Sequence, residues 1–215
     1  MDFELAAWQL SYLCIAPRLV YKHLFYHKQT KNIWSRDDPA MVLLLSACLV
    51  FSATAWGIFY GYTIRGIVCL ALLMILRDFL IVGVFVATGV WLFSRFFLLP
   101  SPPISHQTEN SLEWAYAFDV HTNSFFPFYL WLYVIQLFLA PLIDQDRWLS
   151  LWLGNTLYLA AFAQYTYITY LGLNALPFLI RSELLLFPLI PLLLTYIVSL
   201  LGFNISKAVL AMYFR

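Results

Sequence analysis

The stretch EWAYAFDVHTNSFFP (residues 113–127) lies between two long apolar halves of a chain of 215 residues. It holds three ionisable side chains, Glu113, Asp119 and His121, together with the amide of Asn123 and five aromatic residues. A sequence with so little charge elsewhere has few places for such a cluster. The stretch is therefore expected to be either a junction at a membrane surface or a binding site.

The composition of the whole chain decides its class. Hydrophobic residues make up 63% and charged residues 11%, whereas soluble domains contain roughly 45–50% apolar and about 25% charged residues. The net charge of +1 provides no overall field that would attract nucleic acid. The three cysteines stand in apolar surroundings without a CxxC spacing, so buried free thiols are expected. The sequence predicts an all-α polytopic membrane protein.

Five apolar runs are long enough to cross the hydrocarbon layer, which takes about 20 residues of helix. Residues 40–201 are therefore expected to form a five-span helical domain, followed by a lumenal tail at 202–215. The expected spans are residues 40–60, 68–88, 122–140, 148–167 and 182–201. Small residues at spacings of four, around Gly57 and Gly83, predict close approaches between helix backbones.

Residues 1–39 are expected to lie at the membrane surface. The apolar run Phe3–Ala16 is only about 14 residues long, too short to cross, and Pro17 restarts the chain. We interpret this region as a pair of interfacial amphipathic helices followed by a linker of basic and then acidic residues. A single tilted span is the alternative, but it would bury Arg18 and Lys22 at a cost of a few kcal/mol each.

The linker YHKQTKNIWSRDDP (residues 26–39) is the most hydrophilic stretch of the chain. It is either a solvated connection or a docking surface for a cytosolic partner. Its acidic end suits a helix start, with an aspartate as N-cap and Pro39 in the first turn. The candidate interaction surface combines it with the opening stretch: Lys28, Lys31, Trp34, Arg36, Asp37, Asp38, Glu113, Trp114, Asp119, His121 and Asn123. We expect Arg36, Asp37 or Asp38 to pair with Glu113, Asp119 or His121.

The distribution of basic residues predicts the topology. Seven lysines and arginines lie on the side of the membrane that is expected to hold the N-terminus, and four lie on the other side. Because positive charge favours the cytosolic side, the N-terminus is expected in the cytosol and the C-terminus in the lumen. The sequence Asn204-Ile-Ser206 then becomes a lumenal glycosylation sequon next to the membrane.

Several polar residues fall within the expected spans and form a candidate intramembrane network: Arg77, Asp78, Gln136, Asn155 and Gln164. Such residues commonly make hydrogen bonds between helices. The alternative is a lipid or ion pathway lined by Asn155, Gln164 and Asp78.

The sequence gives little support for catalysis. Glu113, Asp119 and His121 could ligate a metal, but their spacing points them in different directions on a helix. HExxH and GxSxG motifs and a glycine-rich phosphate loop are absent from the sequence. We therefore expect no enzyme activity, no metal site and no cofactor.

Three long stretches resemble the Unc-fifty family of eukaryotic Golgi membrane proteins. They are YHKQTKNIWSRDDPA (residues 26–40), EWAYAFDVHTNSFFP (113–127) and GNTLYLAAFAQYTYITYLGLNALPFL (154–179). The resemblance implies a five-span protein of Golgi and early secretory membranes with a cytosolic N-terminus. It further implies a link to vesicular traffic, to the exchange factors that activate Arf GTPases, and to delivery of membrane receptors to the cell surface. The family offers no catalytic residues to carry over.

We therefore expect a Golgi scaffold whose cytosolic face, among membrane lipids, recruits trafficking machinery. The first alternative is the lipid or ion pathway. The second is an RNA-binding protein of the inner nuclear membrane, a role and location that the resemblance also brings in; the ER is a further alternative location. RNA binding is disfavoured because Lys28, Lys31 and Arg36 are few and stand beside acidic residues.

Overall fold

The computed structural model describes residues 1–31, 33–99 and 112–214. Within these ranges the chain forms helices joined by turns and loops, and no strand is present. The predicted all-α fold of a polytopic membrane protein is confirmed, since four of the described helices are long and apolar enough to cross a membrane.

Two short helices open the chain, α1 (Phe3–Ile15) and α2 (Pro17–Lys31). They separate at Ala16, because a proline cannot continue the hydrogen bonds of α1 but suits the first turn of a new helix. One face of α1 packs on the bundle through buried Leu10 and Leu13, whereas Ile15 is 82% exposed. A helix pair with a packed inner face and exposed apolar residues outside is what an interfacial position requires.

The remaining helices include two long ones that are built from several segments. The first runs over residues 64–98 and the second over residues 114–143. The elements are α3 (Ala40–Phe59), α4 (Ile64–Leu72), η1 (Leu73–Ile81), α5 (Val82–Phe93), η2 (Ser94–Leu98), α6 (Trp114–Tyr129), η3 (Leu130–Ile135), α7 (Gln136–Ile143), α8 (Trp148–Asn174), η4 (Ser182–Leu186), α9 (Leu189–Ser199) and α10 (Ile205–Phe214).

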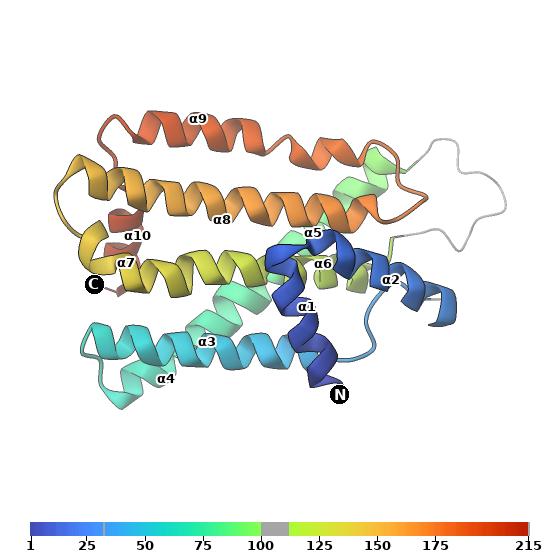
Figure 1. The fold of residues 1–215 in the computed structure, drawn as a ribbon, viewed down its shortest axis with the longest axis horizontal. Helices are drawn as coiled ribbons and strands as arrows, with labels where there is room; N and C mark the ends of the chain where they lie inside the picture. Colours follow the sequence, from blue (N-terminus) through green and yellow to red (C-terminus); the bar gives the residue numbers. More distant parts are fainter. Residues whose placement is uncertain (32, 100–111, 215) are drawn as a thin grey trace.

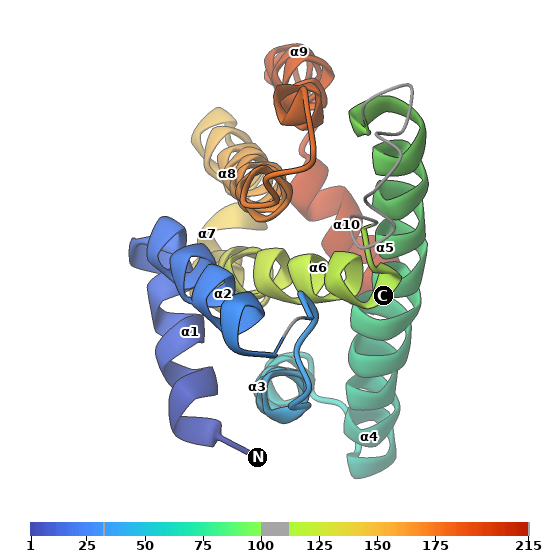
Figure 2. The same ribbon diagram turned by 90° about the vertical axis from the view of Figure 1, so that its right-hand side faces the viewer.

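Helix α6 stands at the centre of the bundle. Helices α3, α6–α7, α8 and α9 run along the long axis of the molecule, while α1 and α2 cross it near the end where α3 begins (Figure 1). Viewed from that end, α6 lies between α3 and α8, with α1–α2 on one side and α5 on the other (Figure 2). The polar stretch of the sequence is thus the start of the central helix, at what we call the N-terminal end of the bundle.

The predicted spans and the observed helices differ in extent. The helices over residues 64–98 and 114–143 are longer than the expected spans at 68–88 and 122–140. A helix of 35 residues is about 52 Å long, more than the ~30 Å hydrocarbon layer, and it accordingly passes obliquely behind the others (Figure 1).

The expected fourth span stays a prediction. Helix α8 has 27 residues, about 40 Å, and is therefore long enough to cross. It is not among the four described helices whose composition also suits a span. Its polar residues lie within the bundle, where neighbouring helices supply hydrogen-bond partners.

Three segments of the long helices are π-helical: η1, η2 and η3. A wider turn interrupts the regular ladder and leaves carbonyl groups available to other partners. The carbonyl of Phe79 in η1 faces His121 Nε2 at 3.2 Å, and the carbonyl of Tyr133 in η3 accepts from Trp56 Nε1 at 2.9 Å. These wide turns therefore connect helices through the backbone.

Glycines let two pairs of helices approach closely. A Cβ on Gly83 of α5 would lie 2.6 Å from the ring of His121, and one on Gly57 of α3 would lie 2.5 Å from Ile67. Real side chains do not approach so closely, so these positions leave no room for a methyl group without a shift of their neighbours.

Candidate functional site

The segment 33–38 is held against the start of α6 by carboxylates. Glu113 accepts hydrogen bonds from the backbone amides of Trp34 (3.3 Å) and Ser35 (3.1 Å), one at each oxygen. Asp119 accepts from the next amide, that of Arg36, at 2.7 Å. Hydrogen bonds to charged groups contribute about 1.5–3 kcal/mol each. Three consecutive amides of a loop are thus fixed on one face of the central helix.

The side chain of Arg36 continues this contact into the interior. Its Nη2 donates to Oδ1 of the fully buried Asn123 at 2.5 Å. The amide of Asn123 donates to the hydroxyl of Tyr21 at 3.4 Å, and that hydroxyl donates to the carbonyl of Ile168 at 3.1 Å. Burial raises the pKa of Tyr21 well above its usual value, so the hydroxyl keeps its proton. A series of hydrogen bonds therefore connects the loop through Asn123 of α6 and Tyr21 of α2 to the backbone of α8.

Two aromatic rings close the same region. Trp34 is 5% exposed and meets the ring of Tyr116 edge-on, with 6.2 Å between centroids. The hydroxyl of Tyr116 donates to the carbonyl of Gly172 at 2.7 Å. Together with the contacts above, they tie α2, α6 and α8 to the loop. We call this assembly the N-terminal junction: Tyr21, Trp34, Ser35, Arg36, Glu113, Tyr116, Asp119 and Asn123.

The structure brings the two predicted segments together but pairs them differently. The carboxylates of Glu113 and Asp119 bind backbone amides, and Arg36 uses its side chain on Asn123. Arg36 Nε and Nη1 are buried without a hydrogen-bond partner among the described residues. Asp38 accepts from the backbone amide of Ala40 at 3.0 Å, but the N-cap of α3 is Pro39 and not the expected aspartate, which lies one residue earlier.

The candidate surface residues fall into three groups. Trp34, His121 and Asn123 are buried. Asp37 and Trp114 are exposed. The partly exposed ones are Lys28, Arg36, Asp38, Glu113 and Asp119. The side chain of Lys31 lies outside the part of the chain that is described.

Because they are buried, Trp34, His121 and Asn123 make contacts inside the molecule and are not available to a partner in this conformation.

In the part of the chain that the structure describes, no group of three or more His, Cys, Asp or Glu residues could hold a metal ion.

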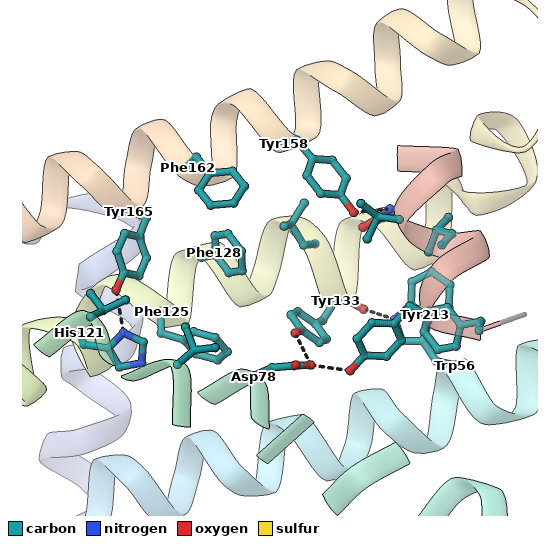
Figure 3. Close-up of a pocket in the computed structure, with 17 residues that line it drawn as sticks. Trp56, Asp78, His121, Phe125, Phe128, Tyr133, Tyr158, Phe162, Tyr165 and Tyr213 are labelled. Atoms are coloured by element: carbon teal, nitrogen blue, oxygen red, sulfur yellow. Dashed lines mark hydrogen bonds between the residues drawn. The ribbon is translucent and has the colours of Figure 1, made fainter. Parts of the chain in front are cut away.

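A second feature, a cavity of about 480 Å³, lies among η1, α5, the second long helix, α8 and α10. His121 and Tyr165 line one end, and Asp78 and Tyr213 line the other (Figure 3). Aromatic rings, such as that of Phe128, line the wall between them. The cavity is thus mainly apolar, with polar groups gathered at its two ends.

Asp78 is surrounded by donors. It accepts hydrogen bonds from the hydroxyls of Tyr133 (3.0 Å) and Tyr213 and from Arg77 Nε at 2.6 Å (Figure 3). The guanidinium of Arg77 also lies over the ring of Tyr213, 4.7 Å from its centroid. Ionisable residues inside a membrane are costly unless paired. Here the charge of the carboxylate is met by three donors from three helices.

His121 is fixed at the other end of the cavity. A carbonyl oxygen can only accept, so the contact with Phe79 makes Nε2 the donor nitrogen of the ring. In the neutral ring Nδ1 then accepts from the hydroxyl of Tyr165, at 2.7 Å. Asp119 and His121 point to different faces of α6, as their spacing predicts: one holds the loop and the other faces the cavity.

The other predicted intramembrane residues form separate contacts. Gln136 donates to Ser206 of α10 at 2.7 Å, and Gln164 accepts from Trp131 Nε1 at 2.7 Å. Asn155 donates to Ser199 Oγ at 2.8 Å and also binds the backbone of residues 203 and 205.

These contacts do not form the predicted pathway. Among the described residues, Asp78 and Gln136 line the cavity, whereas Asn155 and Gln164 do not. Asn155 and Gln164 therefore brace neighbouring helices. Sequence reasoning missed Tyr133 and Tyr213 as partners of Asp78, because only the fold brings these three positions together.

The C-terminal sequon also has a structural role. The side chain of Asn204 accepts from the amide of Lys207 at 2.9 Å, which caps α10, and donates to the carbonyl of Ile143 at 3.4 Å. Ser206 of the same sequon is fully buried. Both residues that an oligosaccharide-transferring enzyme would have to reach are thus engaged within the fold.

Comparison with known proteins identifies relatives over the full length. The model of the UNC-50 family matches residues 1–214. "Protein GMH1 homolog" of Schizosaccharomyces pombe is 44% identical over 215 residues, covering 100% of this chain and 92% of the relative. "Protein unc-50 homolog" of Homo sapiens is 41% identical, covering 99% and 82%. The protein of the same name from Dictyostelium discoideum is 39% identical, covering 100% and 82%. No solved structure matches the chain.

Proposed function

Because this chain belongs to the UNC-50 family, we propose that it is a non-catalytic membrane scaffold of vesicle-mediated transport. Its place is the Golgi and early secretory membranes, with the N-terminus in the cytosol and the C-terminus in the lumen. There it recruits the machinery of an Arf guanine-nucleotide exchange factor and supports the delivery of membrane receptors to the cell surface.

The observation that carries this proposal is the N-terminal junction. A scaffold needs a surface whose shape is set before the partner arrives, because ordering a loop on binding reduces affinity. The junction supplies that order: buried and half-buried groups hold the loop 33–38 on α6, while Asp37 at its edge stays exposed. Trp114 is 39% exposed and is oriented by a bond from its Nε1 to Thr88 Oγ1 at 3.0 Å.

These two side chains give the proposed docking surface its centre. Tryptophan is among the residues that dominate the energy of protein interfaces, and an exposed carboxylate adds charge selectivity. The partly buried contacts of Glu113 hold the loop beneath this surface. The partner is thus expected to contact Asp37 and Trp114 directly.

The experiment is proximity labelling in cells from a tag on the N-terminus, with recovery of the exchange factor as the readout. The test variant is Asp37→Lys with Trp114→Ala. The matched control, Glu183→Lys with Trp148→Ala, reverses an exposed carboxylate and removes an exposed tryptophan outside the proposed docking surface. The test variant should lower recovery of the exchange factor at least 5-fold at unchanged protein level and location, and the control should not.

Equal recovery of the exchange factor with the test variant and the wild type would refute the proposed docking surface. Equal loss with both variants would show a general defect in folding or transport of the protein, and would count against the N-terminal face as the site.

A further inference from the structure

The cavity opens on the flank of the bundle rather than at either end. Val82 of α5, Phe162 of α8 and Val209 of α10 all line it, and they are 43%, 43% and 37% exposed. Val82 lies in a helix that is apolar enough to cross a membrane. A mouth edged by these side chains faces hydrocarbon, so what enters it must come from the lipid layer.

The cavity is elongated. His121 at one end and Tyr133 near the other are twelve residues apart on one continuous helix, which corresponds to about 18 Å. Its volume of about 480 Å³ is in the range of small-molecule sites. Rings such as those of Phe125 and Phe128 line the stretch between the ends (Figure 3). These dimensions suit an extended acyl chain.

A cation stands at the end of the cavity that holds Asp78. Arg77 offers five N–H donors, and its bond to Asp78 uses Nε. The hydroxyls of Tyr133 and Tyr213 already donate to the same carboxylate, so Asp78 does not depend on Arg77 alone. The side chain of Arg77 is 48% exposed. The guanidinium can therefore bind a further anion beside the cavity.

The aromatic residues near this cation indicate its depth. The rings of Trp56 and Tyr60, at the end of α3, stack on Phe214 with centroids 4.8 and 4.7 Å away. Tryptophan and tyrosine gather where a membrane meets water. Tyr213, the neighbour of Phe214, lies under the guanidinium of Arg77. The long, half-exposed side chain of Arg77 can therefore extend from within the membrane toward the headgroup level near Trp56 and Tyr60.

We propose that the cavity binds one glycerophospholipid from the membrane leaflet at the C-terminal end. One acyl chain extends through the cavity toward His121, and the phosphate contacts the guanidinium of Arg77. A sterol would fill the apolar part but has no anionic group for Arg77. This binding is independent of the proposed role in transport, since Asp37 and Trp114, at the centre of the proposed docking surface, do not line the cavity.

The test uses the purified full-length chain in vesicles of phosphatidylcholine that include phosphatidylcholine with a photoactivatable group near the end of one acyl chain. After illumination, mass spectrometry locates the labelled peptides. Label is expected on the cavity segments of α6 and α8. The unlabelled phosphatidylcholine of the vesicles competes with the photoactivatable lipid for the cavity. An equal mole fraction of a photoactivatable sterol should give less label on these cavity segments.

Two variants of one helix separate cavity binding from general lipid contact. Val82→Trp fills the mouth, whereas Val84→Trp adds the same bulk at a position that is 45% exposed and does not line the cavity. Val82→Trp should lower cavity labelling at least 5-fold and Val84→Trp should leave it unchanged. Arg77→Gln should lower labelling more than Arg77→Lys, which keeps the charge.

Equal labelling of the two tryptophan variants would overturn the proposal, and so would stronger cavity labelling by the sterol. Wild-type labelling of Arg77→Gln would refute the phosphate contact. If Arg77→Gln does not give a monodisperse protein, the pair at positions 82 and 84 still decides the matter.

Discussion

Replacing Gly83 with alanine is expected to destabilise the bundle through a single methyl group. The new Cβ would lie 2.6 Å from both Cδ2 and Nε2 of His121 and 3.0 Å from Phe118. The ring of His121 cannot simply turn aside, because it is held by the carbonyl of Phe79 and the hydroxyl of Tyr165. Overpacking of this kind costs about 1–3 kcal/mol.

The expected effect is measurable as a change in melting temperature. For a chain of this size about 1 kcal/mol corresponds to roughly 2–4 °C, so Gly83→Ala should lower Tm by about 2–12 °C in detergent. Gly89→Ala on the same helix is the matched control, since nothing lies within 4 Å of its Cβ. Alanine favours helix over glycine by up to about 1 kcal/mol, so the control should be neutral or slightly stabilising.

A double-mutant cycle identifies the cause. In a His121→Ala background the nearest obstacle is gone, and Gly83→Ala should cost less than half of what it costs in the wild type. An unchanged cost in that background would refute the proposed clash, and so would equal Tm values for Gly83→Ala and Gly89→Ala.

Three further results are expected. Glu113→Ala removes the acceptor of two loop amides and should cost about 2–4 kcal/mol in thermal unfolding, while the exposed carboxylate of Glu183 can be replaced by alanine with little effect. Asn204 should carry no glycan in cells, because its side chain caps α10, and treatment with a glycosidase should leave the mobility of the protein unchanged. The hydrogen bond and charge of Lys207 hold the pKa of Asp146 below its usual value of 3.8, so Lys207→Gln should raise it in an NMR titration. The pKa of Asp146 is lower in the folded than in the unfolded protein. The ion pair therefore stabilises the folded state at pH values above 3.8, and this contribution is lost as the pH falls through the folded pKa.

Each of these has an opposite outcome. Loss of stability in Glu183→Ala equal to that of Glu113→Ala would mean that burial of the loop amides is unimportant. A glycan on Asn204 would mean that α10 leaves its observed position in the cell. An unchanged pKa of Asp146 in Lys207→Gln would mean that the two side chains do not meet in solution.

The sequence predicts the helices whose ends are marked by particular residues. Pro17 separates α1 from α2, and α3 starts one residue later than the linker pattern indicates, with Pro39 as its N-cap. The meeting of the linker with α6 also follows, since complementary charge and a shared membrane side favour it. At these positions the local sequence is sufficient to predict the structure, without knowledge of contacts distant in the chain.

Other features depend on contacts distant in the sequence. An aspartate that binds a backbone amide looks the same in sequence as one that binds an arginine, so the role of Asp119 could not be assigned. The π-helical turns have no sequence signature, and they place the carbonyl of Phe79 against His121. How far the first long helix extends beyond the expected span at residues 68–88 depends on its tilt, because an oblique helix can exceed the thickness of the membrane.

The partners of Asn155 determine when the bundle can become complete during synthesis. They lie 44 to 50 residues further along the chain, which a ribosome adds in about 2–10 s. Until then the newly made α8 carries an unsatisfied amide, which disfavours its release into lipid as an isolated helix. Helix α8 is therefore expected to remain in contact with the membrane insertion machinery until α9 and α10 have emerged from the ribosome. Nascent chains stalled before residue 199 should remain associated with that machinery longer than chains that extend past residue 205.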